Sequence, residues 1–267
     1  MREELDSRPA QDEVQALLAQ ARPGLAPGEL DFGALDEAAL QRLDAHLAAA
    51  EQGRWTDFYA DRARPCPFFV DKPDENLARW LDEGLLPAAG RALDVGCGHG
   101  RNALHLARSG WAVQALDASP TALAWARERV AASGLSVQLI QGLVQDFRSD
   151  AQGPGPGLDL IYDSGCFHHI APHRRRGYLA HLAAQLRPGG WLGLVSFRPD
   201  GGCGWSDAEV YRRAGLGGGL GYAAETLQRW LAEAGLQTLV CSAMRELGPE
   251  APHFGKGFLW TLLARRA

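Results

Sequence analysis

The chain has 267 residues, of which 46% are hydrophobic and 22% charged, and these proportions are typical of globular proteins with a sizeable core. The net charge of −5 and the pI of about 5.9 exclude a basic binding surface, so we expect no nucleic-acid partner. The sequence has a charged start without an apolar leader and no run of about 18 apolar residues, so we also expect no membrane partner.

The first 60 residues predict a helical N-terminal extension. Leucine and alanine recur at helical spacing over 12–24, closed by Pro23 and Gly24, and again over 35–53, which ends at Gly53. Neither segment carries candidate catalytic residues, so we expect it to pack on the core or to close over it. From residue 61 to residue 267 we expect one α/β domain.

Strands and helices alternate from residue 90 onward. Short apolar strands are predicted at 91–95, 111–117, 136–142, 158–165 and 191–197, with helices at 101–110, 119–134 and 173–190. Ser119 is a suitable N-cap for the second of these helices, and Pro120 fits its first position. This alternation predicts right-handed crossovers and a doubly wound, mostly parallel sheet.

The C-terminal part completes the predicted sheet. A glycine-rich insert at about 200–221, with Trp205 and Tyr211 between its glycine runs, is consistent with a lid. A helix is predicted at 222–235, followed by two strands that no helix separates, at 237–247 and 257–266. We therefore expect a Rossmann-like, seven-stranded α/β fold with an antiparallel edge strand formed by a hairpin.

The sequence LDVGCGHG ends the first of these strands in a glycine-rich turn. Gly96, Gly98 and Gly100 allow tight backbone angles and let a ligand approach the backbone closely. Asp117 ends the next strand at the distance where an acid accepts the hydroxyls of a ribose. The loop and this acid together predict a ligand that contains adenosine.

The spacing of the loop distinguishes between adenosine ligands. Dinucleotide sites favour GxGxxG, whereas this loop reads GxGxG and follows Asp94, whose carboxylate would repel a diphosphate. An acid at this place suits an ammonium group instead. S-adenosylmethionine (SAM) carries an ammonium, a sulfonium and a ribose but no phosphate, so we predict SAM as the cofactor.

These motifs resemble the class I SAM-dependent methyltransferases over about residues 88–200. LDVGCGHG resembles the family's motif I, ALDASP its ribose-binding motif, QGLVQDF its adenine-binding segment, LDLIYDSGCFHHI its motif IV and LRPGGWLGLVSF the strand that follows. A narrower resemblance, to the thiopurine S-methyltransferase group and tellurite-resistance methyltransferases, rests on Trp55 and Tyr59 followed by Pro67-Phe68-Phe69, and on GHGRNALHLA. Ser164 and Leu143 depart from the patterns of these families, where an arginine and an adenine-contacting acid are usual.

The resemblance implies a set of cofactor contacts. They are Trp55, Tyr59, Asp94, Gly96, Gly98, Arg101, Asn102, Asp117, Ala118, Asp146, Phe147 and Asp163. Trp55 and Tyr59 would close the methionine end of SAM, with packing of the extension as the alternative. Because Leu143 replaces the usual acid, the adenine contact would move to Asp146 or to the backbone near Val144.

Two residues are candidates for catalysis. His168 follows the fourth strand at its carboxyl end, where open α/β sheets bind ligands, and it or His169 is a candidate general base; a packed, structural histidine is the alternative. Asp163 is the second candidate, carried over from the resemblance. Five scattered cysteines without a CxxC pair indicate free thiols, so we expect a cytoplasmic protein without a metal site.

The predicted function is transfer of a methyl group from SAM to a sulfur, selenium, oxygen or nitrogen atom of a small molecule. An alternative is attack on the γ-carbon of SAM, either by an acceptor of the aminocarboxypropyl group or within SAM to give azetidine-2-carboxylate, with release of methylthioadenosine. A third possibility is a SAM-binding module without catalytic activity. The sequence does not identify the acceptor or the oligomeric state.

Overall fold

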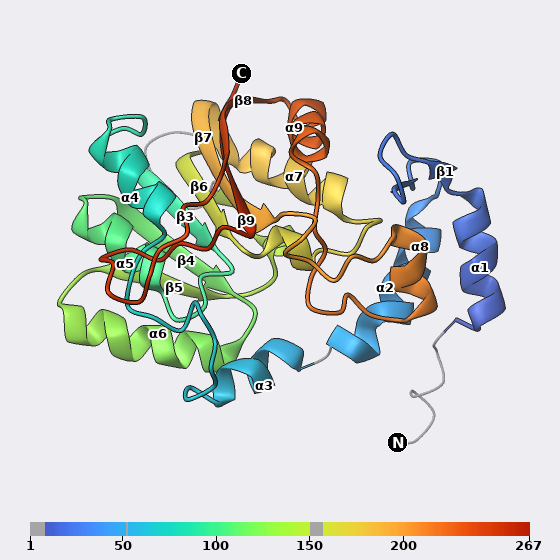
Figure 1. The fold of residues 1–267 in the computed structure, drawn as a ribbon, viewed down its shortest axis with the longest axis horizontal. Coiled ribbons are helices and arrows are strands. Elements are labelled where there is room, and N and C mark those ends of the chain that lie inside the picture. Colours follow the sequence, from blue (N-terminus) through green and yellow to red (C-terminus); the bar gives the residue numbers. More distant parts are fainter. Residues whose placement is uncertain (1–8, 52, 150–156) are drawn as a thin grey trace.

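The structure is a computed structural model, and it describes residues 9–51, 53–149 and 157–267. Residues 1–8 of the predicted extension lie outside the described residues. The predicted Rossmann-like fold is confirmed: a mostly parallel sheet is flanked by helices on both faces (Figure 1).

The sheet has seven strands in the order β5-β4-β3-β6-β7-β9-β8. Their bounds are β3 Arg91–Val95, β4 Ala112–Asp117, β5 Val137–Gln141, β6 Leu158–Ser164, β7 Leu186–Phe197, β8 Leu236–Ala243 and β9 Leu259–Arg266. The first five strands in this order pair in parallel. The hairpin predicted at the edge is present, because β9 pairs antiparallel with both β7 and the outermost strand β8.

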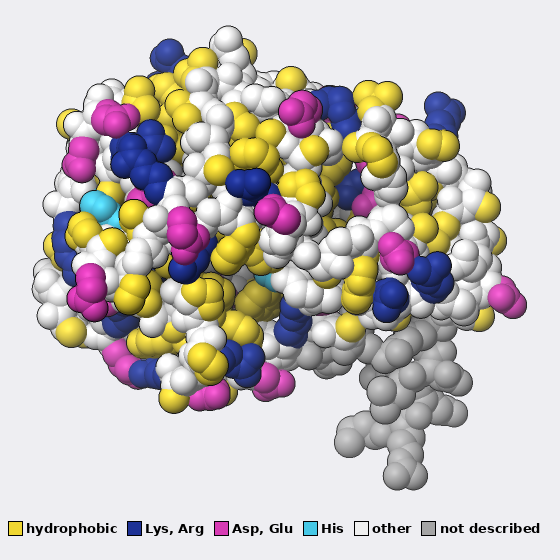
Figure 2. All heavy atoms as spheres, viewed as in Figure 1, with side chains coloured by type: hydrophobic (Ala, Val, Ile, Leu, Met, Phe, Trp, Pro, Cys, Tyr) yellow, Lys and Arg dark blue, Asp and Glu magenta, His cyan; other side chains and the backbone are white. Residues whose placement is uncertain are grey.

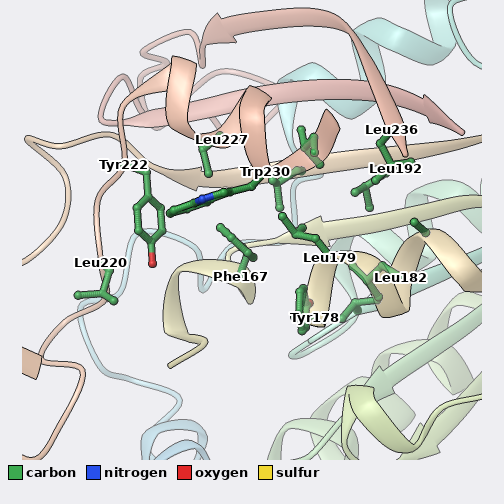
Figure 3. Packing of buried hydrophobic residues seen from close by; sticks show 14 of the residues in the cluster. Phe167, Tyr178, Leu179, Leu182, Leu192, Leu220, Tyr222, Leu227, Trp230 and Leu236 are labelled. Atoms are coloured by element: carbon green, nitrogen blue, oxygen red, sulfur yellow. The ribbon is translucent and has the colours of Figure 1, made fainter. Parts of the chain in front are cut away.

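Helices cover each face of this sheet. The helices α4 (Glu75–Asp82), α5 (Arg101–Arg108) and α6 (Pro120–Ser133) pack on one face, and α7 (Arg175–Gln185) and α9 (Ala224–Glu233) on the other. The strands alternate accordingly: in β6, Ile161 points into the core under α7 and α9, whereas Leu160 points to the opposite side. Figure 3 shows the core on the α7 and α9 side, with Trp230 lying between Tyr222 and Phe167.

Two local predictions can be compared with the structure in detail. Ser119 caps α6 as expected, since its side chain accepts a hydrogen bond from the backbone of Ala122 at 3.2 Å. The helix predicted at 173–190 ends instead at Gln185. The next residue, Leu186, is buried and pairs with Leu158 as the first residue of β7. The helix therefore ends where the chain enters the sheet, before Pro188-Gly189-Gly190.

The N-terminal helices and the insert pack together beside the sheet (Figure 1). This region contains α1 (Gln11–Gln20), the ribbon β1 (Arg22–Pro23) and β2 (Leu30–Asp31), α2 (Glu37–Glu51), α3 (Arg54–Ala60) and α8 (Asp207–Arg212). Buried Glu29 joins it to α7 and α9: its carboxylate accepts hydrogen bonds from Arg176 of α7 at 3.1 Å and from Arg229 and the Trp230 indole of α9 at 2.6 and 3.0 Å. The N-terminal region is thus tied to the helices on one face of the sheet.

Candidate active site

A cavity of about 610 Å³ lies at the carboxyl ends of β3, β4, β6 and β7. The glycine loop, the end of β4, the loop after β6, α3 and the segment before β9 all contribute to its wall. In the space-filling view, apolar side chains surround a hollow, and acidic and basic side chains are scattered over the face (Figure 2). Its volume lies within the range of small-molecule sites.

The glycine loop forms the floor of this cavity. Gly96, Gly98 and Gly100 have φ angles of +61°, +55° and +81°, a left-handed region that favours glycine. A Cβ on Gly96 would approach the Cβ of Cys166 to 3.0 Å, and one on Gly98 would collide with the Tyr59 hydroxyl. The loop therefore needs glycines both for its backbone angles and for the close approach of its neighbours.

Asp94 is the last acid before the loop, and it lines the cavity. It is 2% exposed, and its carboxylate accepts a hydrogen bond from the Ala103 backbone at 2.9 Å. Burial raises the pKa of the Asp94 carboxyl to about 8, against an opposing effect of the Arg101 cation. A cation that entered the cavity would favour the ionised form of this acid.

Asp117 is fixed at the end of β4. One carboxylate oxygen accepts from the Gly98 backbone and the other from the Ser119 backbone, both at 2.8 Å. Burial raises the pKa of Asp117, and these backbone hydrogen bonds oppose that effect. The acid and Ala118 beside it line the cavity, so each carboxylate oxygen keeps a lone pair for the hydroxyls of a ligand.

Arg101 reaches the cavity through a buried polar cluster that the sequence did not predict. Its guanidinium forms an ion pair of 2.6 Å with Asp74, which is completely buried. Asp74 also accepts hydrogen bonds from the side chains of Tyr162, Ser164 and Asn102 at 2.8, 2.6 and 3.1 Å. Ser164, at the position where a resembling group has arginine, therefore helps to hold Arg101.

The predicted aromatic pair lies on α3 and faces the loop. Tyr59 is buried above Gly98, and its ring stacks on Phe69 with 5.3 Å between ring centroids. Trp55 is half-buried and meets the His169 ring edge-on at 4.7 Å. Both residues line the cavity, so α3, the last helix of the predicted extension, forms part of the site.

Four of the predicted cofactor contacts, Gly98, Asp146, Phe147 and Asp163, do not line the cavity. Asp146 is exposed on the 3₁₀ turn Val144–Asp146, and Phe147 is packed in the core. Asp163 is completely buried, and its carboxylate accepts from the Tyr178 hydroxyl at 2.6 Å and from the Cys166 backbone at 2.8 Å. These bonds give Asp163 a role in shaping the loop after β6. Residues Leu143 to Gln145, by contrast, do line the cavity.

His168 and His169 lie on the 3₁₀ turn Phe167–His169 and line the cavity. Burial, with a smaller effect of His169, holds the pKa of His168 well below its usual range. Burial and then the Arg54 cation lower the pKa of His169 to about 3. Both rings are therefore neutral near pH 7.

The C-terminal segment supplies two aromatic residues that the sequence analysis did not assign to the site. Phe254 and Phe258 line the cavity, and the guanidinium of Arg101 lies 4.6 Å from the centre of the Phe254 ring. Both precede β9, and no motif marks them. They reach the cavity because β9, which follows them, pairs antiparallel with β7.

All five cysteines are free thiols, and three of them, Cys66, Cys97 and Cys166, line the cavity. Within the described ranges, no group of three or more His, Cys, Asp or Glu side chains is arranged to hold a metal ion. In the same residues, no helix is both long enough and apolar enough to cross a membrane.

Comparisons with known proteins agree with this geometry. Residues 92–190 match a family model described as a methyltransferase domain. A 2-heptyl-1-hydroxyquinolin-4(1H)-one methyltransferase from Mycobacteroides abscessus is 32% identical over 143 residues, which are 52% of this chain and 60% of that relative. The chain spans about three fifths of the length of such curated relatives.

Two solved structures are similar over most of the chain. The first comes from work on the conversion of a disulfide bond into a thioacetal group during echinomycin biosynthesis. It is 28% identical to this chain with a TM-score of 0.58, and the match covers 76% of this chain and 85% of that structure. The second is TehB from Haemophilus influenzae, at 19% identity and a TM-score of 0.53, with 71% and 62% covered. The second likeness shows the fold alone. Together, the family model and the curated relatives show that part of this chain is similar to methyltransferases.

Proposed function

We propose that this chain transfers the methyl group of SAM to a small molecule in the cavity above the glycine loop. The observation that carries the proposal is the pair of buried carboxyls, Asp94 and Asp117, beside that loop. An acid with a pKa raised to about 8 in a closed pocket is suited to a cationic ligand and not to a phosphate. The chemistry of these two carboxyls therefore fits SAM.

Each part of the cavity can be given a role on this basis. Asp94 would face the ammonium group, and Asp117 would accept the ribose hydroxyls. The backbone from Leu143 to Gln145 would contact the adenine, in place of the predicted side chains of Asp146 and Phe147. Trp55 and Tyr59 would cover the methionine end.

When bound, SAM supplies a methyl group that is already activated on a sulfonium. The protein then has mainly to align the acceptor with that methyl group and to exclude water, which the largely apolar wall supports. Small-molecule acceptors are also favoured by the name of the Mycobacteroides relative. The narrower resemblance to thiopurine and tellurite-resistance methyltransferases remains a prediction. The free thiols favour a reducing compartment such as the cytoplasm.

The direct test combines calorimetry with product analysis. We expect SAM and S-adenosylhomocysteine to bind the purified protein and NAD not to bind. Incubation with SAM and a panel of small phenols, thiols and amines, followed by mass spectrometry, should give S-adenosylhomocysteine and a methylated acceptor. Methylthioadenosine as the spent nucleoside, or binding of NAD without SAM, would contradict the proposal.

The role of α3 can be tested separately. Trp55→Ala removes an aromatic wall beside His169, and we expect SAM affinity to fall about tenfold because an aromatic contact is lost. Trp55→Phe keeps most of that surface and is the matched control, with an expected affinity close to that of the wild type. If both variants bind SAM as the unchanged protein does, Trp55 only packs the extension.

A further inference from the structure

The ring of His168 is held in one orientation. The backbone N–H of Phe197 donates a hydrogen bond to His168 Nδ1 at 3.2 Å. The His168 ring also stacks on the Phe197 ring, with 3.7 Å between centroids and 10° between planes. A Cβ on Gly219 would lie 3.0 Å from His168 Cδ2, so that side of the ring is closed as well. The hydrogen bond and the stacking contact together favour this orientation of the imidazole.

This hydrogen bond fixes the tautomer of His168. A backbone N–H can only donate, so Nδ1 must present its lone pair. Because burial keeps the imidazole neutral, its one proton resides on Nε2. His168 lines the cavity and is 4% exposed, and Nε2 has no hydrogen-bond partner among the described residues. An N–H without a partner at such a place favours a ligand that can accept its hydrogen bond.

We propose that His168 binds the methyl acceptor as a fixed hydrogen-bond donor, and that the acceptor reacts as an ionised aromatic hydroxyl or thiol. This inference rests on the proposed methyl transfer and names its substrate class. It replaces the general-base role predicted for His168 from the sequence, because Nδ1 is occupied and Nε2 already carries a proton.

An ionised acceptor fits because none of the described residues on the cavity wall near His168 is a suitable base. His169 has a pKa lowered to about 3, so it is a weak base. Burial raises the pKa of the Cys66 and Cys166 thiols, so these thiols remain protonated. The Arg54 guanidinium lies on the same wall, close enough to lower the pKa of His169, and it is held there by an ion pair of 3.0 Å with Glu51.

An aromatic acceptor fits the rest of the wall. The cavity is lined by rings from three parts of the chain: Trp55, Phe58, Phe68, Phe197, Phe254 and Phe258. Several of these rings pack against one another. The Phe58 and Phe68 rings, for example, are stacked, with 5.9 Å between their centroids. Flat rings bind well between such walls.

The transfer step then balances without a proton acceptor on the protein. The acceptor loses its proton to water before it binds. A lone pair on its oxygen or sulfur forms the bond to the methyl carbon while the bond between that carbon and the sulfonium breaks, and the released electron pair stays on the sulfur. His168 keeps its proton throughout and donates to a second lone pair of the acceptor.

Three variants at position 168 test this role. His168→Ala removes the donor, and we expect kcat/KM for 4-nitrophenol or thiophenol to fall about 10- to 100-fold, as for a lost hydrogen bond to a charged group. His168→Gln places an amide N–H near the position of Nε2 and should restore most of the activity, whereas His168→Asn mimics Nδ1 and should not. SAM affinity by calorimetry should be unchanged in all three.

The outcomes separate the possible roles. Equal losses in the Gln and Ala variants would overturn the donor role, and a large loss of SAM affinity would make His168 a cofactor contact. If the unchanged protein binds SAM but methylates no phenol or thiophenol, the acceptor class is wrong while the proposed cofactor stands. Failure to bind SAM would instead remove the proposed function.

Two further measurements do not depend on the size of a mutational effect. Long-range ¹H–¹⁵N spectra of the imidazole should show the proton of His168 on Nε2, and a proton on Nδ1 would overturn the inference. The pH at half-maximal kcat/KM should follow the acceptor's own pKa across a series of substituted phenols. A midpoint that stays constant would point to a protein group instead. Among the described residues, the titratable or charged groups named on this wall are His169, Cys66, Cys166 and Arg54.

Discussion

Replacement of Asp94 by asparagine is expected to weaken SAM binding by about 10- to 100-fold and to stabilise the ligand-free protein. The carboxyl is almost completely buried, and burial raises its pKa to about 8. Asparagine keeps an oxygen that can accept the hydrogen bond from the Ala103 backbone, but it removes the charge that a cationic ligand needs. Calorimetry with SAM and urea unfolding without ligand measure the two effects.

The expected stabilisation depends on pH with a definite sign. Asp94 has a pKa of about 8 in the folded protein and the ordinary value of 3.8 when unfolded, so the folded state binds more protons between these values. Its contribution to stability therefore declines as pH rises through this window. Asp117 and Asp163 act in the same direction, so the difference between the wild type and Asp94→Asn isolates the contribution of Asp94. We expect this difference to be near zero at pH 4 and about 1–3 kcal/mol at pH 8.

Asp159→Asn is the matched control. Asp159 lies at the other end of the sheet, where it accepts hydrogen bonds from the Arg91 backbone and the Arg187 side chain, and its pKa is lowered. This variant should bind SAM as the wild type does and should lose stability. If both variants keep their SAM affinity, Asp94 does not face the cation. If Asp94→Asn shows the pH dependence of the wild type, the pKa of Asp94 is not raised in the folded protein.

The sequence predicted the parts of the site that depend on local patterns. The loop from Gly96 to Gly100 needs left-handed glycines, and Asp117 follows from the end of the next strand, so neighbouring residues were enough to identify them. Asp74 was missed because its function depends on Arg101 and Ser164, which are 27 or more positions away in the sequence. No periodicity or spacing marks such a contact.

The same distinction explains His168. The sequence placed it at the carboxyl end of a strand, which the structure also shows. Its tautomer depends on the backbone of Phe197, which lies 29 positions later on a neighbouring strand. The residue type of His168 and its place after a strand could therefore be predicted from the sequence, whereas the nitrogen that carries its proton depends on the fold.

The largest loss of stability is expected from breaking the ion pair between Arg175 and Asp207. The two side chains are 2% and 7% exposed, and their guanidinium and carboxylate form two hydrogen bonds, of 2.8 and 2.5 Å. Asp207 also accepts from the Leu30 backbone at 2.7 Å. Asp207→Ala leaves a buried guanidinium without its partner, so we expect a loss of about 3–5 kcal/mol in the free energy of unfolding, measured with urea.

The control for this variant is an exposed ion pair with similar geometry. Arg62 and Glu128 also form two hydrogen bonds, of 2.6 and 2.9 Å, but their side chains are 42% and 61% exposed, so Glu128→Ala should cost less than about 1 kcal/mol. Asp207 begins α8 inside the glycine-rich insert, and its bond to Leu30 joins that insert to the N-terminal region. A loss as small as that of the control would mean that the insert is only weakly attached and free to act as the predicted lid. A loss of the expected size would mean that α8 is a fixed part of the fold, and that any movement over the cavity must come from the glycine runs on either side of it.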